Sequence, residues 1–210
     1  MNKLQNFFFS KETRFAKWDF LVFMFLTLAA LWQRQTTVFY LIYFFWWTEL
    51  ITISIDKLFY RKNPNAKLFE IGKHSFFTSV LLLAIYFIFI VLIFGYFAVA
   101  NQSAELLVNF QVLRFENWFF NANLLFVIIE RIFQHKSHQK MHVGFGGFTM
   151  NMIVIHLSII FGAIVLFFVV KAFPNTFTLD NSWSILLIAL PFLLLKLVAN
   201  YLSNRLVKLG

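Results

Sequence analysis

Long apolar blocks constrain this chain more than any other feature. The stretch 80–94, for example, contains no charged residue and would be apolar on every face of a helix. An α-helix rises 1.5 Å per residue, so about 20 residues cross the ~30 Å hydrocarbon layer of a membrane. Strands of an outer-membrane barrel alternate apolar and polar residues instead. Because lipid offers no hydrogen-bond partner to the backbone, these blocks predict transmembrane helices.

Six such spans are predicted, and together they cover most of the 210 residues. They run approximately over 18–32, 37–58, 75–100, 117–133, 148–170 and 183–202. No linker or repeat separates them, so residues 1–210 are predicted to form one transmembrane domain. The fold class is therefore an all-α polytopic transmembrane bundle of about six helices. The short first span could instead be a signal peptide, but the next apolar block follows after only a five-residue gap, which favours a retained helical hairpin.

Composition supports the membrane class and narrows the chemistry. Hydrophobic residues make up 60% of the chain and charged residues 13%, whereas soluble domains carry about 25% charged residues. There is no cysteine, which excludes disulfides, thiolate metal sites and cysteine nucleophiles.

The distribution of basic residues predicts the orientation of the bundle. Of the eighteen Lys and Arg, fourteen fall on the side that holds both termini and two long loops, and one lies within a span. The opposite side holds only Arg34, Arg114 and Lys171. By the positive-inside rule, both termini are cytoplasmic, in a bacterial cytoplasmic (inner) membrane. The net charge of +9 is then explained by topology and by anionic headgroups on the cytoplasmic side, and nucleic acid is not a predicted partner.

Three ionisable residues lie at membrane depth, where burial of a charge is expensive. Eight residues, about 12 Å at the helical rise, separate Glu49 from Lys57, His156 from Phe148 and Lys196 from Asn204, three residues at or near the predicted cytoplasmic ends of their spans. A common depth on three helices predicts one intramembrane polar cluster. It could be a structural ion pair with a hydrogen-bonded histidine, or a site that binds a proton or a substrate.

A second group of candidates follows the fourth span. His135, His138 and His142 are spaced by three and four residues, so they would share one face if the helix continued into the cytoplasm. Such imidazoles could bind a divalent metal. The nearby Lys136 and Lys140 speak against a metal, and the alternative is a polar loop that touches lipid headgroups. Arg131 is expected to be a headgroup anchor, and Glu130 is expected to point into the bundle.

Motifs of membrane enzymes are not evident. The turn at 144–147 lacks the serine nucleophile of rhomboid proteases, and the His-Glu-x-x-His pattern of zinc proteases does not occur. A transporter remains possible, although no two-fold repeat or broken helix is apparent; Pro191 is the one residue expected to kink a span. An enzyme is therefore not the favoured class.

Three short segments resemble a known family. The aromatic segment 43–49 that ends in Glu49, the helix 155–162 with His156, and the segment 195–200 with Lys196 are similar to the second, fifth and last helices of a bacterial six-helix integral membrane protein family known only as a domain of unknown function. At Asn200 that family more often has Asp. The resemblance implies a compact six-helix membrane protein and marks the same three residues, but it implies no activity.

Three functional hypotheses follow from these features. The first is a non-enzymatic accessory or assembly subunit, with a membrane protein partner or a second copy of itself and no cofactor. The second is a small proton-coupled transporter that uses Glu49, His156 and Lys196. The third is a membrane-bound enzyme that depends on a divalent metal at His135, His138 and His142, or on haem, for which one axial ligand such as His156 would suffice.

Overall fold

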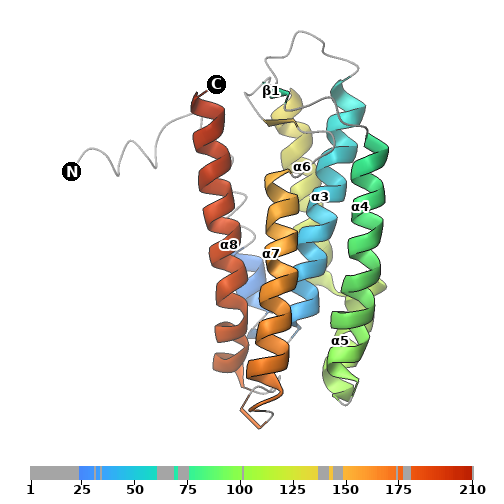
Figure 1. Cartoon of the computed structure of the whole chain (residues 1–210), viewed down its shortest axis with the longest axis vertical. Helices are drawn as coiled ribbons and strands as arrows, with labels where there is room; N and C mark the ends of the chain where they lie inside the picture. Colours follow the sequence, from blue (N-terminus) through green and yellow to red (C-terminus); the bar gives the residue numbers. More distant parts are fainter. Residues whose placement is uncertain are drawn as a thin grey trace, which may run out of the picture.

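The structure, a computed structural model, describes residues 24–30, 32–33, 35–60, 69–70, 76–100, 102–136, 142–143, 149–173, 175–176 and 181–209. Within these ranges the chain is helical apart from one pair of two-residue strands, which confirms the predicted all-α class (Figure 1). From residue 38 onward, the α-helices of the described residues are α3 (Val38–Tyr60), α4 (Phe76–Phe89), α5 (Ser103–Leu113), α6 (Trp118–Lys136), α7 (Met150–Ile164) and α8 (Ser182–Leu209).

Two of these helices continue in other helical forms. The π-helix η2 (Ile90–Tyr96) and the 3-10 helix η3 (Phe97–Val99) extend α4, and the π-helix η4 (Val165–Val170) extends α7. With these extensions, four stretches are long and apolar enough to cross a membrane. They are Val38–Phe59, Phe76–Val99, Ser103–Lys136 and Asn151–Val170.

Polar capping residues set where three helices begin. The side-chain oxygens of Thr37, Asn117 and Thr149 accept hydrogen bonds from the backbone amides three residues later, at 3.1, 3.0 and 3.1 Å. These bonds satisfy amides that have no partner within the helix itself. The caps place the starts of α3, α6 and α7 within two residues of the predicted span starts.

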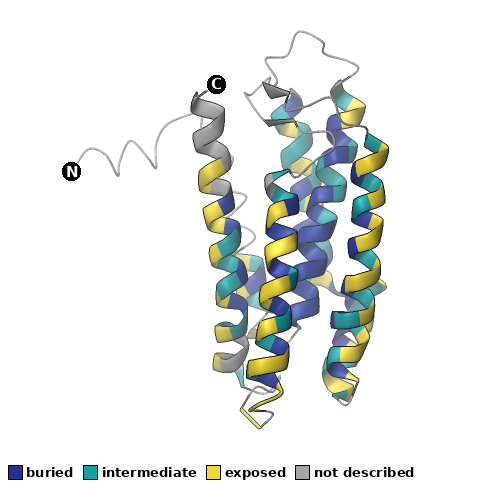
Figure 2. Ribbon diagram, in the orientation of Figure 1, coloured by how far each residue is buried: buried dark blue, intermediate teal, exposed yellow. Residues whose placement is uncertain are grey.

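The central helix of the bundle is α3. In its most apolar stretch 72% of the residues are buried, compared with 22% for α4. It packs against α4, α6, α7 and α8, and Figure 2 shows it largely in the colour of buried residues. Its rings stack on one another and on those of its neighbours: Tyr43 lies 5.0 Å from Phe39 of the same helix and 5.5 Å from Phe120 of α6, measured between ring centroids. Aromatic burial of this kind gives the bundle its core.

The predicted spans and the observed helices differ most between residues 100 and 118. The sequence predicts a connection there, but α5 occupies 103–113 and is separated from α6 by a break at 114–117. At the break Phe115 has a φ of 61°, a left-handed conformation that no continuous helix contains. The expectation that no helix is broken is therefore wrong.

Asn109 explains why α5 docks against the bundle. Its amide nitrogen lies 3.3 and 3.2 Å from the carbonyl oxygens of Phe94 and Gly95 in η2, and its oxygen accepts a bond of 2.6 Å from the hydroxyl of Thr37. A wide π-helical turn leaves carbonyls available for such partners. One buried amide thus joins the start of α3 to η2 and α5.

The outer spans differ from their predicted limits in smaller ways. Helix α8 runs to Leu209 and passes through Pro191 without interruption, although it was predicted to end near 202. Of the first predicted span, 18–32, the structure describes residues 24–30 as helical, together with residue 32, and the remainder lies outside the described residues.

Candidate functional site

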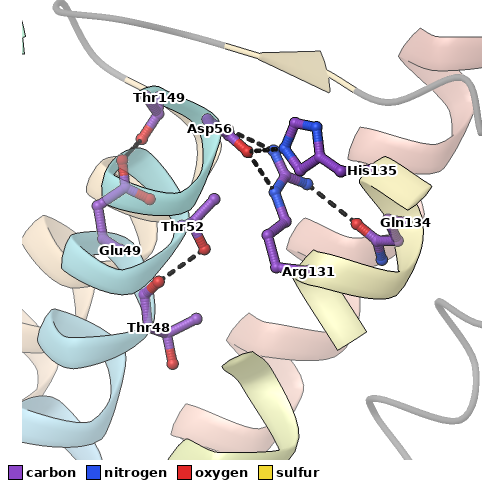
Figure 3. Close-up of polar contacts among 8 residues, drawn as sticks. All are labelled: Thr48, Glu49, Thr52, Asp56, Arg131, Gln134, His135 and Thr149. Carbon is purple, nitrogen blue, oxygen red and sulfur yellow. Dashed lines mark hydrogen bonds and ion pairs between the residues drawn. The ribbon is translucent and has the colours of Figure 1, made fainter. Parts of the chain in front are cut away.

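A buried ion pair joins α3 to α6 near the end of both helices. The guanidinium of Arg131 donates from Nε to Oδ1 of Asp56 at 2.7 Å and from Nη2 to Oδ2 at 2.5 Å (Figure 3). The Asp56 side chain is 2% exposed and the Arg131 side chain 14%. This two-point contact fixes the orientation of both groups and is the strongest geometry available to an arginine and a carboxylate.

His135 binds the same carboxylate. Its Nε2 lies 2.8 Å from Oδ1 of Asp56, and its ring stacks on Phe59 with centroids 5.1 Å apart. Arg131 and His135 are four residues apart, so they share one face of α6. Asp56 is therefore the centre of a triad with two donors from one helix.

Two further side chains brace the arginine. Gln134 accepts from Nη1 of Arg131 at 3.1 Å and donates to Glu130 at 2.7 Å. Through Gln134, Glu130 of the same helix is linked to the arginine of the triad. The headgroup-anchor role expected for Arg131 is wrong, because the guanidinium turns inward to Asp56 instead of outward to lipid.

Glu49 forms the deeper part of the same polar region. It is 1% exposed, and its Oε1 accepts a hydrogen bond of 2.7 Å from the hydroxyl of Thr149. That hydroxyl also accepts from the amide of Met152, so its one hydrogen and one of its two lone pairs are used. Asn151 is a second neutral neighbour of the Glu49 carboxyl. No basic group among the described residues forms an ion pair with Glu49.

The charges of these groups are close enough to influence one another. Glu49 and Asp56 are seven residues apart on α3, so both lie on one side of the helix, about 10 Å apart along its axis. Glu49 interacts electrostatically with both Asp56 and Arg131. We name the set of Glu49, Asp56, Arg131 and His135 the end cluster.

The predicted cluster of Glu49, His156 and Lys196 is not formed. In the part of the chain that the structure describes, no hydrogen bond or ion pair joins any two of these residues. His156 instead meets Tyr86 of α4, with Nδ1 and the hydroxyl oxygen 3.1 Å apart, and Lys196 is a buried residue of α8.

Glu49 and His156 do not meet because α3 and α7 are offset along the axis of the bundle. Glu49 bonds to Thr149 at the very start of α7, which places His156 two turns, or about 10 Å, further along that helix. Eight residues from the predicted end of each helix therefore did not correspond to one depth in the bundle. The start of α7 lies level with Glu49, whereas α3 continues beyond that level to Tyr60.

The predicted metal face of His135, His138 and His142 is also wrong in its geometry. Helix α6 ends at Lys136, so it does not carry all three. His142 belongs to strand β2 (His142–Val143), which pairs with β1 (Phe69–Glu70), and His138 lies outside the described residues. Among the residues that the structure describes, no group of three potential metal ligands occurs.

The fold and the end cluster define an all-α protein with four membrane-compatible helices and a buried polar network at one end of the bundle. Comparisons with family models, with curated proteins and with solved structures find no match. The resemblance to the six-helix family of unknown function thus stays a prediction, and the site is interpreted from its geometry alone.

Proposed function

We propose that this chain is a multi-pass integral membrane protein of a bacterial cytoplasmic membrane that acts without catalysis, as an accessory or assembly subunit. Both termini lie on the cytoplasmic side in this proposal, and the end cluster lies near that side. The bundle is covered by lipid and by a membrane protein partner or a second copy of the chain.

One observation carries the membrane assignment. The outward face of α4 and η2 exposes a continuous apolar surface, while the interior helix α3 is enclosed by the other helices (Figure 2). Water in contact with so large an apolar surface would be unfavourable, whereas lipid is not. The exposed residues of this face are Phe77, Leu81, Ile85, Ile88, Phe89 and Leu92.

The strand pair supports the proposed topology. Phe69 and Glu70 lie in the loop after the second predicted span, and His142 and Val143 lie in the loop after the fourth. Their pairing puts these two loops on one side of the bundle, which is the side that the basic residues predict to be cytoplasmic.

Single introduced cysteines test the topology, because the chain has no other thiol. Lys136 is exposed at the end of α6, and Lys171 is exposed beyond η4. In intact cells a membrane-impermeant maleimide should label Lys171→Cys, and it should label Lys136→Cys only after permeabilisation.

The matched control lies inside a span. Phe168 is 74% exposed in the isolated bundle, so a membrane-embedded chain should protect Phe168→Cys until a denaturing detergent is added. Ready labelling of Phe168→Cys in intact cells would contradict the membrane assignment. Labelling of Lys136→Cys in intact cells would contradict only the orientation.

The subunit role gives the polar groups a structural use. The end cluster and Asn109 both bond across helix pairs, which fixes helices relative to one another. As a test of the role itself, mild extraction from native membranes should yield a stoichiometric partner or a homo-oligomer. A monodisperse single chain at that step would count against this role and leave the membrane assignment intact.

A proton-coupled transporter is the second candidate. It is favoured by Glu49, a buried carboxyl at membrane depth whose contacts are neutral, since such groups commonly serve in proton relays. In proteoliposomes, Glu49→Gln should abolish proton-driven flux while the protein remains folded. His156→Gln is the matched control, because it changes an intramembrane polar residue outside the end cluster.

A further inference from the structure

His156 is a polar side chain on the outer surface of the bundle. It is exposed on α7, and its Nδ1 lies 3.1 Å from the hydroxyl oxygen of Tyr86 on α4. The two rings lie 6.0 Å apart, measured between their centroids. A hydrogen bond thus joins α4 and α7 at a place where part of the imidazole still faces the surroundings of the protein.

The depth of this pair follows from the length of α4 and its extensions. Tyr86 lies ten residues from the start and thirteen residues from the end of the stretch Phe76–Val99, which is long enough to cross a membrane. At the helical rise these separations are about 15 and 20 Å, so Tyr86 lies near the middle of the span. His156 bonds to Tyr86 and therefore lies close to the same depth.

The surface around His156 is otherwise apolar. Along α7 the exposed side chains that flank it are Ile153, Leu157 and Ile160, and on α4 the exposed neighbour of Tyr86 is Ile85. Figure 2 shows exposed residues along both helices. The imidazole is thus a single polar group within an apolar face.

The outer faces of α6 and α8 differ from this face. Every exposed side chain between residues 119 and 135 of α6, and between residues 186 and 199 of α8, is a Leu, Ile, Val or Phe. Such faces suit lipid hydrocarbon. Histidines within transmembrane segments are rare and almost always face the protein interior. An exposed imidazole near mid-membrane depth therefore indicates that protein, and not lipid, covers this part of α7.

We propose that the face of α7 around His156 binds a second copy of this chain, in a parallel dimer whose two-fold axis runs along the membrane normal beside His156. This inference rests on the proposed membrane assignment. It deepens the proposed subunit role, because it names both the partner and the surface that the partner contacts.

Symmetry makes a second copy the fitting occupant. Copies that insert with the same orientation have His156 at the same depth, and a two-fold axis brings identical residues face to face. A neutral imidazole has one donor and one acceptor nitrogen, so two imidazoles can form a hydrogen bond with each other. The hydroxyl of Tyr86 can donate to Nδ1 or accept from it, and so it supports either tautomer. The chain itself thus supplies the polar group that complements His156.

The exposed stripe of α7 also fits a parallel helix pair. Ile153, His156, Ile160 and Ile164 are all exposed and follow one another at spacings of three and four residues. Side chains at these spacings form one seam along a helix, and two such seams can interdigitate. A single polar residue within an apolar seam fixes the register of the pair. We name these four residues the α7 seam.

Disulfide cross-linking tests the contact, because the chain contains no cysteine. In native membranes, oxidation of Ile153→Cys or Ile160→Cys should yield a covalent dimer of two identical chains, since both positions lie on the α7 seam and flank His156. The control is Leu194→Cys, which is exposed on α8 and lies outside the seam. It should yield at least about tenfold less dimer, because a disulfide requires Cα atoms within about 7 Å of each other.

Dimerisation in liposomes tests the polar pairing separately. Energy transfer between labelled copies of the full-length protein measures the dimer as the ratio of protein to lipid is lowered. His156→Leu should weaken the dimer about tenfold, as expected when one hydrogen bond between membrane helices is lost. His156→Asn keeps a donor and an acceptor, so it should dimerise as the wild type does.

Four results would overturn the proposal. They are the absence of a cross-linked dimer at both seam positions, equally efficient cross-linking through Leu194→Cys, cross-linking of the seam to a different polypeptide, and a dimer that His156→Leu does not weaken. If His156→Leu fails to fold, the cross-linking variants retain His156 and still decide the question. A different polypeptide at the seam would refute the dimer and leave the subunit role intact. The membrane assignment fails on another observation, the ready labelling of Phe168→Cys, so the two failures are distinguishable.

Discussion

Asp56 should be the residue on which the packing of α3 against α6 most depends. Its carboxylate accepts three hydrogen bonds, two from Arg131 and one from His135. In Asp56→Asn the side-chain volume is kept but the charge is lost, and an amide NH₂ then faces a guanidinium that can only donate. The free energy of unfolding should fall by about 3–5 kcal/mol, as expected when one partner of a buried ion pair is removed.

Arg131→Met should lower the free energy of unfolding by less than Asp56→Asn does. The remaining carboxylate still has its hydrogen bond with His135. We expect a loss of about 2–3 kcal/mol in the free energy of unfolding, below the range for an unpaired buried charge. In the double variant Asp56→Asn/Arg131→Met no buried charge is left unpaired, so its cost should be only about 1–2 kcal/mol.

The double-mutant cycle measures this difference directly. Equilibrium unfolding of the detergent-solubilised protein can be followed by fluorescence, since the chain has six tryptophans. The coupling energy should be at least about 3 kcal/mol, the upper end for residues in one network, because the two single losses together exceed the loss in the double variant by that much or more. Additive losses, or a larger loss for Arg131→Met than for Asp56→Asn, would refute the view that Asp56 is the shared acceptor.

Two further substitutions test close packing elsewhere. In Gly162→Ala the new methyl group would lie 2.7 Å from Cδ1 of Ile42, so the free energy of unfolding should fall by about 1–3 kcal/mol, and Gly95→Ala, whose nearest atom is 3.1 Å away, should cost less. Equal losses for the two glycines in the same unfolding assay would contradict this. Asn109→Leu should lower the free energy of unfolding by about 2–3 kcal/mol, because it leaves buried carbonyl oxygens without a hydrogen-bond donor. Thr37→Val, which removes only one donor to Asn109, should lower it by about 1 kcal/mol. A larger loss for Thr37→Val would show that Asn109 does not hold α5.

Hydrophobicity alone predicted the main elements of this fold. The starts of α3, α6 and α7 lie within two residues of the predicted span starts, and the structure shows a capping Thr or Asn before each apolar block. Helix α5 was missed, since its sequence mixes Glu105, Asn109 and Gln111 with apolar residues and resembles a connecting loop. Its helical state depends on tertiary bonds from Asn109 to η2, which no local pattern reveals.

The site was predicted only in part. Glu49 was identified because burial of a charge at membrane depth is costly. Asp56 and Arg131 were missed as a pair, because both lie near helix ends, where charged residues usually reach water or headgroups. One signal was present: Asp56 follows Glu49 by seven residues and so continues its face of α3. Its partner on α6 depends on the relative register of two helices, which residue counts did not give.

The polar contacts of α3 with α6 are stronger than those with α7. To α6 it is tied at two levels, by Tyr40 with Asn123 at 3.0 Å and by Asp56 with Arg131 and His135. To α7, the polar ties at the end cluster are the hydroxyl bond from Thr149 to Glu49 and the contact of Glu49 with Asn151, and both partners are neutral. A neutral hydrogen bond contributes about 1 kcal/mol, whereas a buried charge pair costs several kcal/mol to break.

This inequality determines which helices could separate in a conformational change. The pair α3–α6 should move as one unit, and α7 should be the element whose start can leave Glu49, since only neutral partners hold it there. Amide hydrogen exchange should therefore be faster at the first turn of α7 than at the last turns of α3 and α6. Thr149→Val should increase that exchange locally and leave the α3–α6 amides unchanged. Equal acceleration in all three helices would instead mean that the end cluster opens as a whole.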